Sequence, residues 1–195
     1  MAYPPAADAA GGPVVAGAIL TGGRSRRFGR DKALEAVDGV AMVARVAGAL
    51  RHAGVASVAA VGGDGARLAA LGLDVWPDAH PGEGPLGGVL TALTRADAEL
   101  LVVVACDLPW LDGVTIRRVI AATDASEVDV GVAWTDRPEP LLAAWRVRPC
   151  RAAVAHAFAS GERAVHAVLA DLRCARVPVA PSAVHNVNRP GDLPR

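Results

Sequence analysis

Short apolar runs alternate with amphipathic stretches along the chain from Val14 onward. The apolar runs have the length of β-strands, and turn residues or helical patterns separate them. Several contain no polar residue at all, which is typical of central strands that are buried on both faces. We expect strands over residues 14–20, 55–61, 73–76, 100–105, 128–134, 141–145 and 174–177.

The amphipathic stretches carry apolar residues at helical spacing, and several begin after a polar, Gly or Pro residue. We expect helices over residues 42–53, 66–71, 87–96, 115–122, 148–158 and 164–169. This alternation predicts an α/β fold in which helices flank a mostly parallel sheet. Asp38-Gly39 predicts a tight turn after the short segment 33–37. We expect this segment to form a small excursion of the chain, outside the main sheet, after the first loop.

The size and charge of the chain indicate a single-domain protein that does not bind nucleic acid or a membrane through its overall charge. Its 195 residues suit one domain, which we expect to span residues 14–195. Residues 1–13 mix Ala, Pro and Gly without periodicity, and we expect them to form a disordered tail. Lys plus Arg and Asp plus Glu total 20 each, so no overall charge attracts nucleic acid or an anionic membrane.

Cysteine usage and the absence of targeting patterns indicate a cytoplasmic protein. Cys106, Cys150 and Cys174 are widely spaced and form no zinc-type or redox-type pair. Reduced thiols fit a reducing compartment, and no apolar run approaches the roughly 18 residues of a membrane span. We expect Cys106 to be a buried thiol at a strand end and not a nucleophile. The oligomeric state stays open between a monomer and a small homo-oligomer.

A loop rich in glycine and positive charge follows the first predicted strand directly. Gly22, Gly23 and Gly29 let the backbone approach a ligand, and exposed N–H groups of such a loop can hold phosphate oxygens. The spacing is neither that of a Walker A loop nor that of a dinucleotide fingerprint. A solvated basic turn is the alternative, but the local excess of cations favours a triphosphate. The cations are Arg24, Arg26, Arg27, Arg30 and Lys32.

Two carboxylates follow other predicted strands. Asp107 comes directly after the apolar run that ends at Cys106, and Asp78 follows the short strand 73–76. Ligands of open parallel sheets bind at the carboxyl ends of the strands, and Mg²⁺ prefers one or two carboxylates together with substrate phosphates. Asp107 is therefore a candidate magnesium ligand, with the cap of the following helix as the alternative.

Further polar and glycine-rich loops are weaker signals. Gly84 and Gly88 leave room for a base or sugar, although an ordinary loop between a strand and a helix explains them as well. Asn186 and Asn188 project from the same face of an extended segment and can contact a heterocycle or a phosphate, unless they form Asx turns. Arg163 is a possible anion contact or an exposed turn residue.

The order of these motifs resembles that of molybdenum cofactor guanylyltransferases. The matching segments are LTGGRSRRFGRDKA, GEGPLGG, ACDLP, EPLLAAWR, GERAVHAVL and NVNRPGDL, spread over nearly all of Val14 to Leu193. The resemblance implies a three-layer Rossmann-like sandwich of nucleotidyltransferase type. It also implies transfer of GMP from Mg-GTP to the terminal phosphate of molybdopterin carrying molybdenum, with release of pyrophosphate, and transient contact with cofactor-insertion proteins.

The resemblance also implies roles for individual residues. Lys32, Asp107 and Arg27 would be catalytic, with Asp107 holding Mg²⁺. The acceptor side would comprise Arg163, Asn186 and Asn188. The nucleotide site would comprise Leu20, Thr21, Gly22, Gly23, Lys32, Asp78, Gly84, Gly88 and Asp107.

One stretch departs from the family pattern. Many members carry an Asn after the second strand that helps to read guanine, whereas this chain has Val61-Gly62-Gly63-Asp64. The alternatives therefore include a transferase that uses CTP or another phosphorylated acceptor, and a nucleotide-binding regulator without catalysis. The guanylyl reading requires that the basic loop and Asp107 lie on the same side of the sheet, close enough to share one metal-bound triphosphate.

Overall fold

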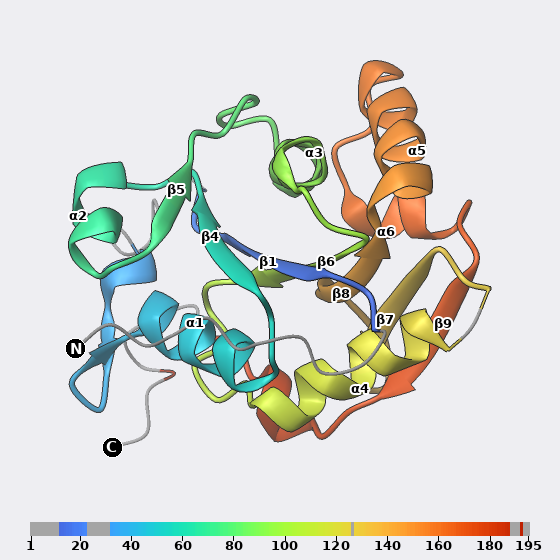
Figure 1. Cartoon of the computed structure of the whole chain (residues 1–195). Coiled ribbons are helices and arrows are strands. Elements are labelled where there is room, and N and C mark those ends of the chain that lie inside the picture. Colours follow the sequence, from blue (N-terminus) through green and yellow to red (C-terminus); the bar gives the residue numbers. More distant parts are fainter. Residues whose placement is uncertain (1–11, 23–31, 126, 188–191, 193–195) are drawn as a thin grey trace.

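The fold is built on one sheet of seven strands in the order β5-β4-β1-β6-β8-β7-β9 (Figure 1). The computed structural model describes residues 12–22, 32–125, 127–187 and 192. All seven strands correspond to the apolar runs in the sequence. Their bounds are Val15–Leu20 for β1, Ser57–Val61 for β4, Asp74–Trp76 for β5, Leu100–Ala105 for β6, Val130–Trp134 for β7, Pro138–Arg146 for β8 and Cys174–Pro178 for β9.

The sheet is mostly parallel, as predicted. β1 lies between β4 and β6 and is parallel to both, so that Leu20 pairs with Val61 on one side and Ala105 on the other. β8 is the exception, because it forms a hairpin with β7 and also runs antiparallel to β6. It begins three residues before the predicted segment 141–145, because two prolines at its start interrupt the apolar pattern there.

Helices cover both faces of the sheet and give three layers (Figure 1). α1 and α4 lie on one face, and α3, α5 and α6 on the other, as the core contacts also show. Each predicted helix is present, with ends that shift by a few residues. The bounds are Met42–His52 for α1, Gly65–Ala70 for α2, Pro85–Arg95 for α3, Gly113–Asp124 for α4, Val147–Ala159 for α5 and Val165–Leu169 for α6.

The helix ends depend on local hydrogen-bonding chemistry. Asp112 accepts a 2.7 Å hydrogen bond from the amide of Thr115, so α4 begins two residues earlier than the apolar pattern predicts. α3 begins at Pro85, directly after Gly84, because proline suits the first helical turn, where its missing N–H is not needed. Capping thus determines boundaries that periodicity alone leaves open.

The hydrophobic core has a layer on each side of the sheet. On one face Val43, Val46 and Leu50 of α1 are spaced at three and four residues and are fully buried in the same cluster as Ile19. On the other face the buried side chains of α3 belong to the same cluster as Trp145 of β8. Burial of each such large side chain stabilises the fold by about 1.5–3 kcal/mol, which holds the strand ends in fixed relative positions.

The predicted excursion after the first loop is also present. It consists of the 3₁₀-helix η1, Lys32–Leu34, and a small hairpin of β2, Ala36–Val37, with β3, Val40–Ala41. Asp38 and Gly39 both have positive φ, at 51° and 77°, as the tight hairpin turn requires. A second 3₁₀-helix, η2, spans Pro181–Val184. Residues 1–11 of the expected tail lie outside the described residues.

Candidate active site

Three turns meet at the carboxyl ends of the adjacent parallel strands β4, β1 and β6. The amide of Cys106 donates to the carbonyl of Leu20 at 3.3 Å, and the amides of Thr21 and Gly22 both donate to Val61 at 3.1 Å. The Thr21 hydroxyl lies 3.0 Å from the same Val61 carbonyl oxygen. These bonds fix the start of the first loop against the turns that follow β4 and β6. The turns after these strands therefore lie together at one edge of the sheet.

The turn after β4 is shaped to fit the first loop. Gly62 and Gly63 have positive φ, at 74° and 75°, and a Cβ atom at Gly63 would lie only 2.9 Å from the Thr21 hydroxyl. Only glycine combines this backbone conformation with so close an approach. Asp64 then accepts a hydrogen bond from the amide of Arg67 and caps α2.

Lys32 and Asp107 form the central charged pair of the site. The Lys32 Nζ atom lies 2.7 Å from Oδ2 of Asp107, and their side chains are 15% and 18% exposed. Asp107 is two residues beyond β6, and Lys32 opens η1 at the far end of the basic loop. The prediction that the end of this loop lies beside Asp107 is therefore confirmed.

The second carboxylate oxygen of Asp107 is the clearest sign of a ligand. Oδ1 is buried and has no hydrogen-bond partner among the described residues, although Oδ2 is held by Lys32. An ionised oxygen that is buried without a partner costs stability, and such atoms are rare in folded proteins. The arrangement suits an oxygen that bonds to a cation when substrate is bound.

The donor set fits a hard divalent cation that shares its coordination with a substrate. The described residues contain no group of three or more His, Cys, Asp or Glu side chains able to hold a metal. Mg²⁺ does not need such a cage, because it keeps several waters and takes one or two carboxylates with phosphate oxygens. Asp107 is the described residue that fits this role.

Asp78 is brought against the first loop from the other side. It lies two residues beyond β5, and its Oδ1 atom accepts hydrogen bonds from the amide of His80 at 3.0 Å and the hydroxyl of Thr91 at 3.1 Å. Its Oδ2 atom faces Gly22, where a Cβ atom would lie 3.5 Å away. Asp78 thus borders the start of the loop whose far end carries Lys32.

The two predicted glycines of the next loop make close packing contacts. Gly84 has a φ of 83°, and a Cβ atom there would lie 3.2 Å from the carbonyl oxygen of Arg163. Gly88 lies against Leu20, with a corresponding distance of 3.3 Å. Packing therefore already explains both glycines, and a contact of either with nucleotide stays a prediction.

Arg163 joins this loop to the start of α6. Its Nη1 atom donates to the carbonyls of Phe158 and Glu162, its Nη2 atom lies 2.9 Å from Glu83, and its guanidinium stacks 4.0 Å above the Phe158 ring. His80 packs on the same ring, with centroids 4.5 Å apart. The structure thus places Arg163 at the glycine loop that the sequence assigned to the nucleotide.

The C-terminal segment reaches the site through its backbone. The amide of Val187 donates to the carbonyl of Asp107 at 3.0 Å, and the Val187 side chain is buried with Met42 and Val37. The half-buried Asn186 is therefore held beside the Asp107 turn, as its predicted role requires. The predicted site residues Gly23, Arg27 and Asn188 lie outside the described residues.

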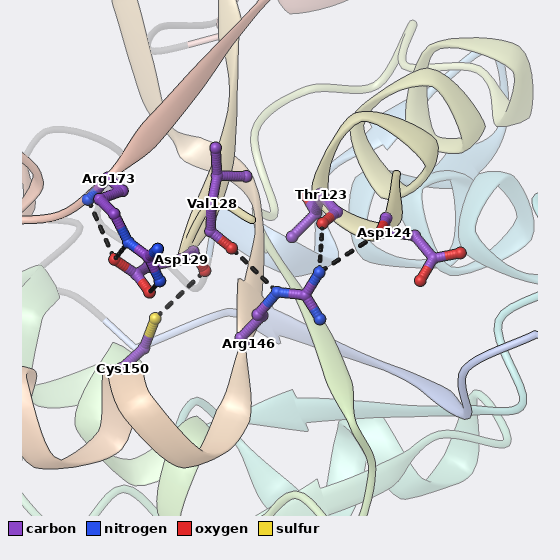
Figure 2. Close-up of polar contacts among 7 residues, drawn as sticks. All are labelled: Thr123, Asp124, Val128, Asp129, Arg146, Cys150 and Arg173. Carbon is purple, nitrogen blue, oxygen red and sulfur yellow. Dashed lines mark hydrogen bonds and ion pairs between the residues drawn. The ribbon is translucent and has the colours of Figure 1, made fainter. Parts of the chain in front are cut away.

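A second polar cluster lies at the opposite edge of the sheet, where β7 begins and β8 ends (Figure 2). Arg173 donates three hydrogen bonds to Asp129 and thereby lowers the pKa of that carboxyl. Arg146 binds the carbonyls at the end of α4. Burial raises the pKa of Cys150 to about 12, so this thiol stays protonated and is no nucleophile. Cys106 is likewise buried, as predicted.

The fold and the site define the class of protein. A mostly parallel sheet carries a glycine turn, a lysine and a largely buried carboxylate at the carboxyl ends of adjacent strands, which is the arrangement of a nucleotide-handling α/β enzyme. No helix in the described part of the chain is long and apolar enough to cross a membrane.

Comparison with known proteins gives the family. The model of the MobA-like NTP transferase domain matches residues 17–177, and the chain belongs to this family. It is 35% identical over 187 residues to molybdenum cofactor guanylyltransferase of Rhodobacter capsulatus, covering 93% of this chain and 94% of the relative. The corresponding enzyme of Bradyrhizobium sp. (strain ORS 278) is 35% identical over 191 residues, covering 92% and 90%.

Solved structures show the same fold. Molybdopterin-guanine dinucleotide biosynthesis protein A from Archaeoglobus fulgidus superposes with a TM-score of 0.75 at 23% identity, covering 90% of this chain and 93% of that one. The prediction of a nucleotidyltransferase-type α/β fold is thereby confirmed, and this chain is a nucleotidyltransferase by family.

Proposed function

We propose that this protein transfers GMP from GTP to the terminal phosphate of molybdopterin carrying molybdenum, in the cytoplasm, and releases pyrophosphate. The names of its relatives support the guanylyl group and the acceptor. The observation that carries a catalytic role is the Asp107 carboxylate, with Lys32 on one oxygen and a buried, unpartnered second oxygen among the described residues. A module that only binds nucleotide has less need of such an oxygen.

The reaction is an in-line displacement at the α-phosphorus of GTP. The acceptor phosphate oxygen forms a bond to this phosphorus, and the bond from the phosphorus to the bridging oxygen of the pyrophosphate breaks. A phosphate is ionised near neutral pH, so no general base is needed and catalysis depends on positioning and electrostatics. Lys32 neutralises phosphate charge, and we assign the same task to Arg27.

Asp107 would hold Mg²⁺ through its buried oxygen. When bound, the ion neutralises charge on the phosphate oxygens that it shares with the substrate. Lys32 orients the Asp107 carboxylate through Oδ2, which leaves Oδ1 for the ion. The pairing of a lysine with the metal-binding carboxylate thus aligns both groups on one triphosphate.

The other predicted residues divide between the two substrates. We assign Asp78, Leu20, Thr21 and Gly22 to the nucleotide side, together with Gly23, Gly84 and Gly88. The amides of Thr21 and Gly22 already donate to Val61, so we expect these residues to shape the loop as well as border the ligand.

We assign Asn186 and Asn188 to the acceptor side, because the C-terminal segment is tied to the Asp107 turn. Arg163 has N–H groups beyond the three contacts that the described residues make with its terminal nitrogens, and these remain for an anion. Cofactor-insertion proteins are proposed as transient partners that receive the product.

The choice between GTP and CTP needs a direct test, because Gly62, Gly63 and Asp64 stand where many relatives have a guanine-reading Asn. The purified protein is incubated with molybdopterin, molybdate, Mg²⁺ and either GTP or CTP, and pyrophosphate release is measured. We expect release with GTP that depends on both acceptor and metal. Preferential release with CTP would replace the guanylyl assignment, and release with neither nucleotide would refute the enzymatic one.

A further inference from the structure

Thr91 is a buried threonine in the middle of α3 that the sequence did not single out. Thr91 is 2% exposed, whereas the other buried residues of this helix are apolar or glycine. A hydroxyl in such a place requires hydrogen-bond partners, because an unpaired buried hydroxyl is costly. Its partners lie in the loop that carries Asp78.

The hydroxyl makes two contacts with this loop and one with its own helix. It lies 3.1 Å from Oδ1 of Asp78, accepts a hydrogen bond from the amide of Ala79 at 3.1 Å, and lies 3.0 Å from the carbonyl oxygen of Gly87. A hydroxyl has one proton to donate, and a charged carboxylate is the stronger acceptor. Donation to Asp78 together with acceptance from Ala79 uses the single proton of the hydroxyl and one of its two lone pairs.

Thr91 is the hydrogen-bond partner that ties the Asp78 side chain to an element outside its own loop. The other donor to Oδ1 is the amide of His80, which belongs to the same loop and moves with it. Thr91 instead belongs to a helix whose Leu86, Val89 and Leu93 are fully buried. With Oδ1 engaged by two donors, Oδ2 is directed toward Gly22 at the start of the basic loop.

We infer that Thr91 is a positioning residue of the nucleotide site, which fixes the Asp78 carboxylate so that its second oxygen faces bound nucleoside triphosphate. This inference rests on the proposed function, in which Asp78 borders the nucleotide. It adds a residue that touches no substrate and acts through Asp78 alone.

The test compares variants that keep the shape of the side chain. Thr91→Val removes the hydroxyl and Thr91→Ser keeps it. Thr123→Val is the matched control, because Thr123 is also fully buried on a helix and bonds the carbonyl four residues earlier, but lies at the opposite edge of the sheet. Binding of Mg-GTP is measured by calorimetry without acceptor, and KM and kcat are measured by pyrophosphate release.

We expect Thr91→Val to weaken GTP binding and raise its KM about tenfold, which is the usual effect of losing one hydrogen bond to a charged group. The kcat at saturating GTP should change much less, and Thr91→Ser and Thr123→Val should bind as the wild type does. In an Asp78→Ala background, Thr91→Val should cause no further loss, a coupling that general destabilisation would not produce. If Thr91→Val does not fold, Thr91→Ala must show the same loss and coupling.

The outcomes separate this inference from the proposed function. Unchanged GTP binding by Thr91→Val, or equal weakening with and without Asp78, would overturn the positioning role while product formation by the wild type still supported the function. The expected binding pattern in a wild type that forms no product would refute the proposed function and leave the positioning role supported. A wild type that does not bind GTP would overturn both.

Discussion

Replacing Asp107 by Asn is the most direct test of the site. The amide keeps the shape of the side chain but removes the negative charge that faces Lys32 at 2.7 Å and that would hold the metal. A unit charge acting across about 4 Å contributes about 4 kcal/mol at an effective dielectric constant of about 20, which suits a pair as little exposed as this one. We therefore expect kcat to fall about a thousandfold, since each 1.36 kcal/mol is about a factor of ten in rate.

The same substitution should affect stability much less than rate. It leaves Lys32 without its carboxylate partner. Because both side chains retain some contact with solvent, we expect the free energy of unfolding to fall by about 1–2 kcal/mol. Thermal unfolding measures this loss, and pyrophosphate release at matched, saturating Mg²⁺ and GTP measures the rate. Asp97→Asn is the control, because Asp97 is an exposed carboxylate before β6, at the other edge of the sheet. A variant of Asp107 that turned over within a few-fold of the wild type would refute the metal-ligand assignment.

Three further predictions concern the scaffold. A thiol reagent should label the exposed Cys174 in the native protein and all three cysteines only after unfolding, as mass spectrometry would show. Asp129→Asn should lower the free energy of unfolding by about 1 kcal/mol at neutral pH. The pKa of Asp129 in the folded protein lies below its ordinary value of 3.8. The stabilisation that its charge provides is therefore complete above pH 3.8 and is lost as the pH falls through the folded pKa. The difference in unfolding free energy between wild type and variant, measured with urea, should disappear in acid. Gly63→Ala should cost about 1–3 kcal/mol more than Gly39→Ala, because both have positive φ but only the new Cβ at position 63 meets the Thr21 hydroxyl; equal costs would contradict this reasoning.

The sequence predicted the elements and the central pair because both depend on local patterns. Apolar runs and helical periodicity identify strands and helices, and a carboxylate that directly follows a buried strand is expected at the ligand-binding edge. Lys32 and Asp107 could be placed together because the strands that precede them are expected to be parallel. The direction of β8 and the order of the strands depend on which segments meet in space, which no local pattern specifies.

The residues that the sequence missed act at long range. Thr91 looks like an ordinary helix residue until α3 is seen beside the Asp78 loop. Val187 looks like a single apolar residue in a polar tail, and its amide is bonded to the turn of Asp107, eighty positions away in the chain. Arg163 was named as a possible anion contact, but the sequence could not show that its terminal nitrogens meet Glu83, eighty positions earlier, and two backbone carbonyls. Each of these contacts follows from the packing of layers and not from a motif.

The hydrogen bond from Val187 to Asp107 has a consequence for biosynthesis. A ribosome makes the chain from its amino end, so the strands and the acidic turn emerge well before the segment that anchors this turn. A nascent chain can form the sheet while the turn of Asp107 still lacks one of its restraints. Catalytic competence should therefore appear only after residue 187 has left the ribosome and its amide can reach the carbonyl of Asp107.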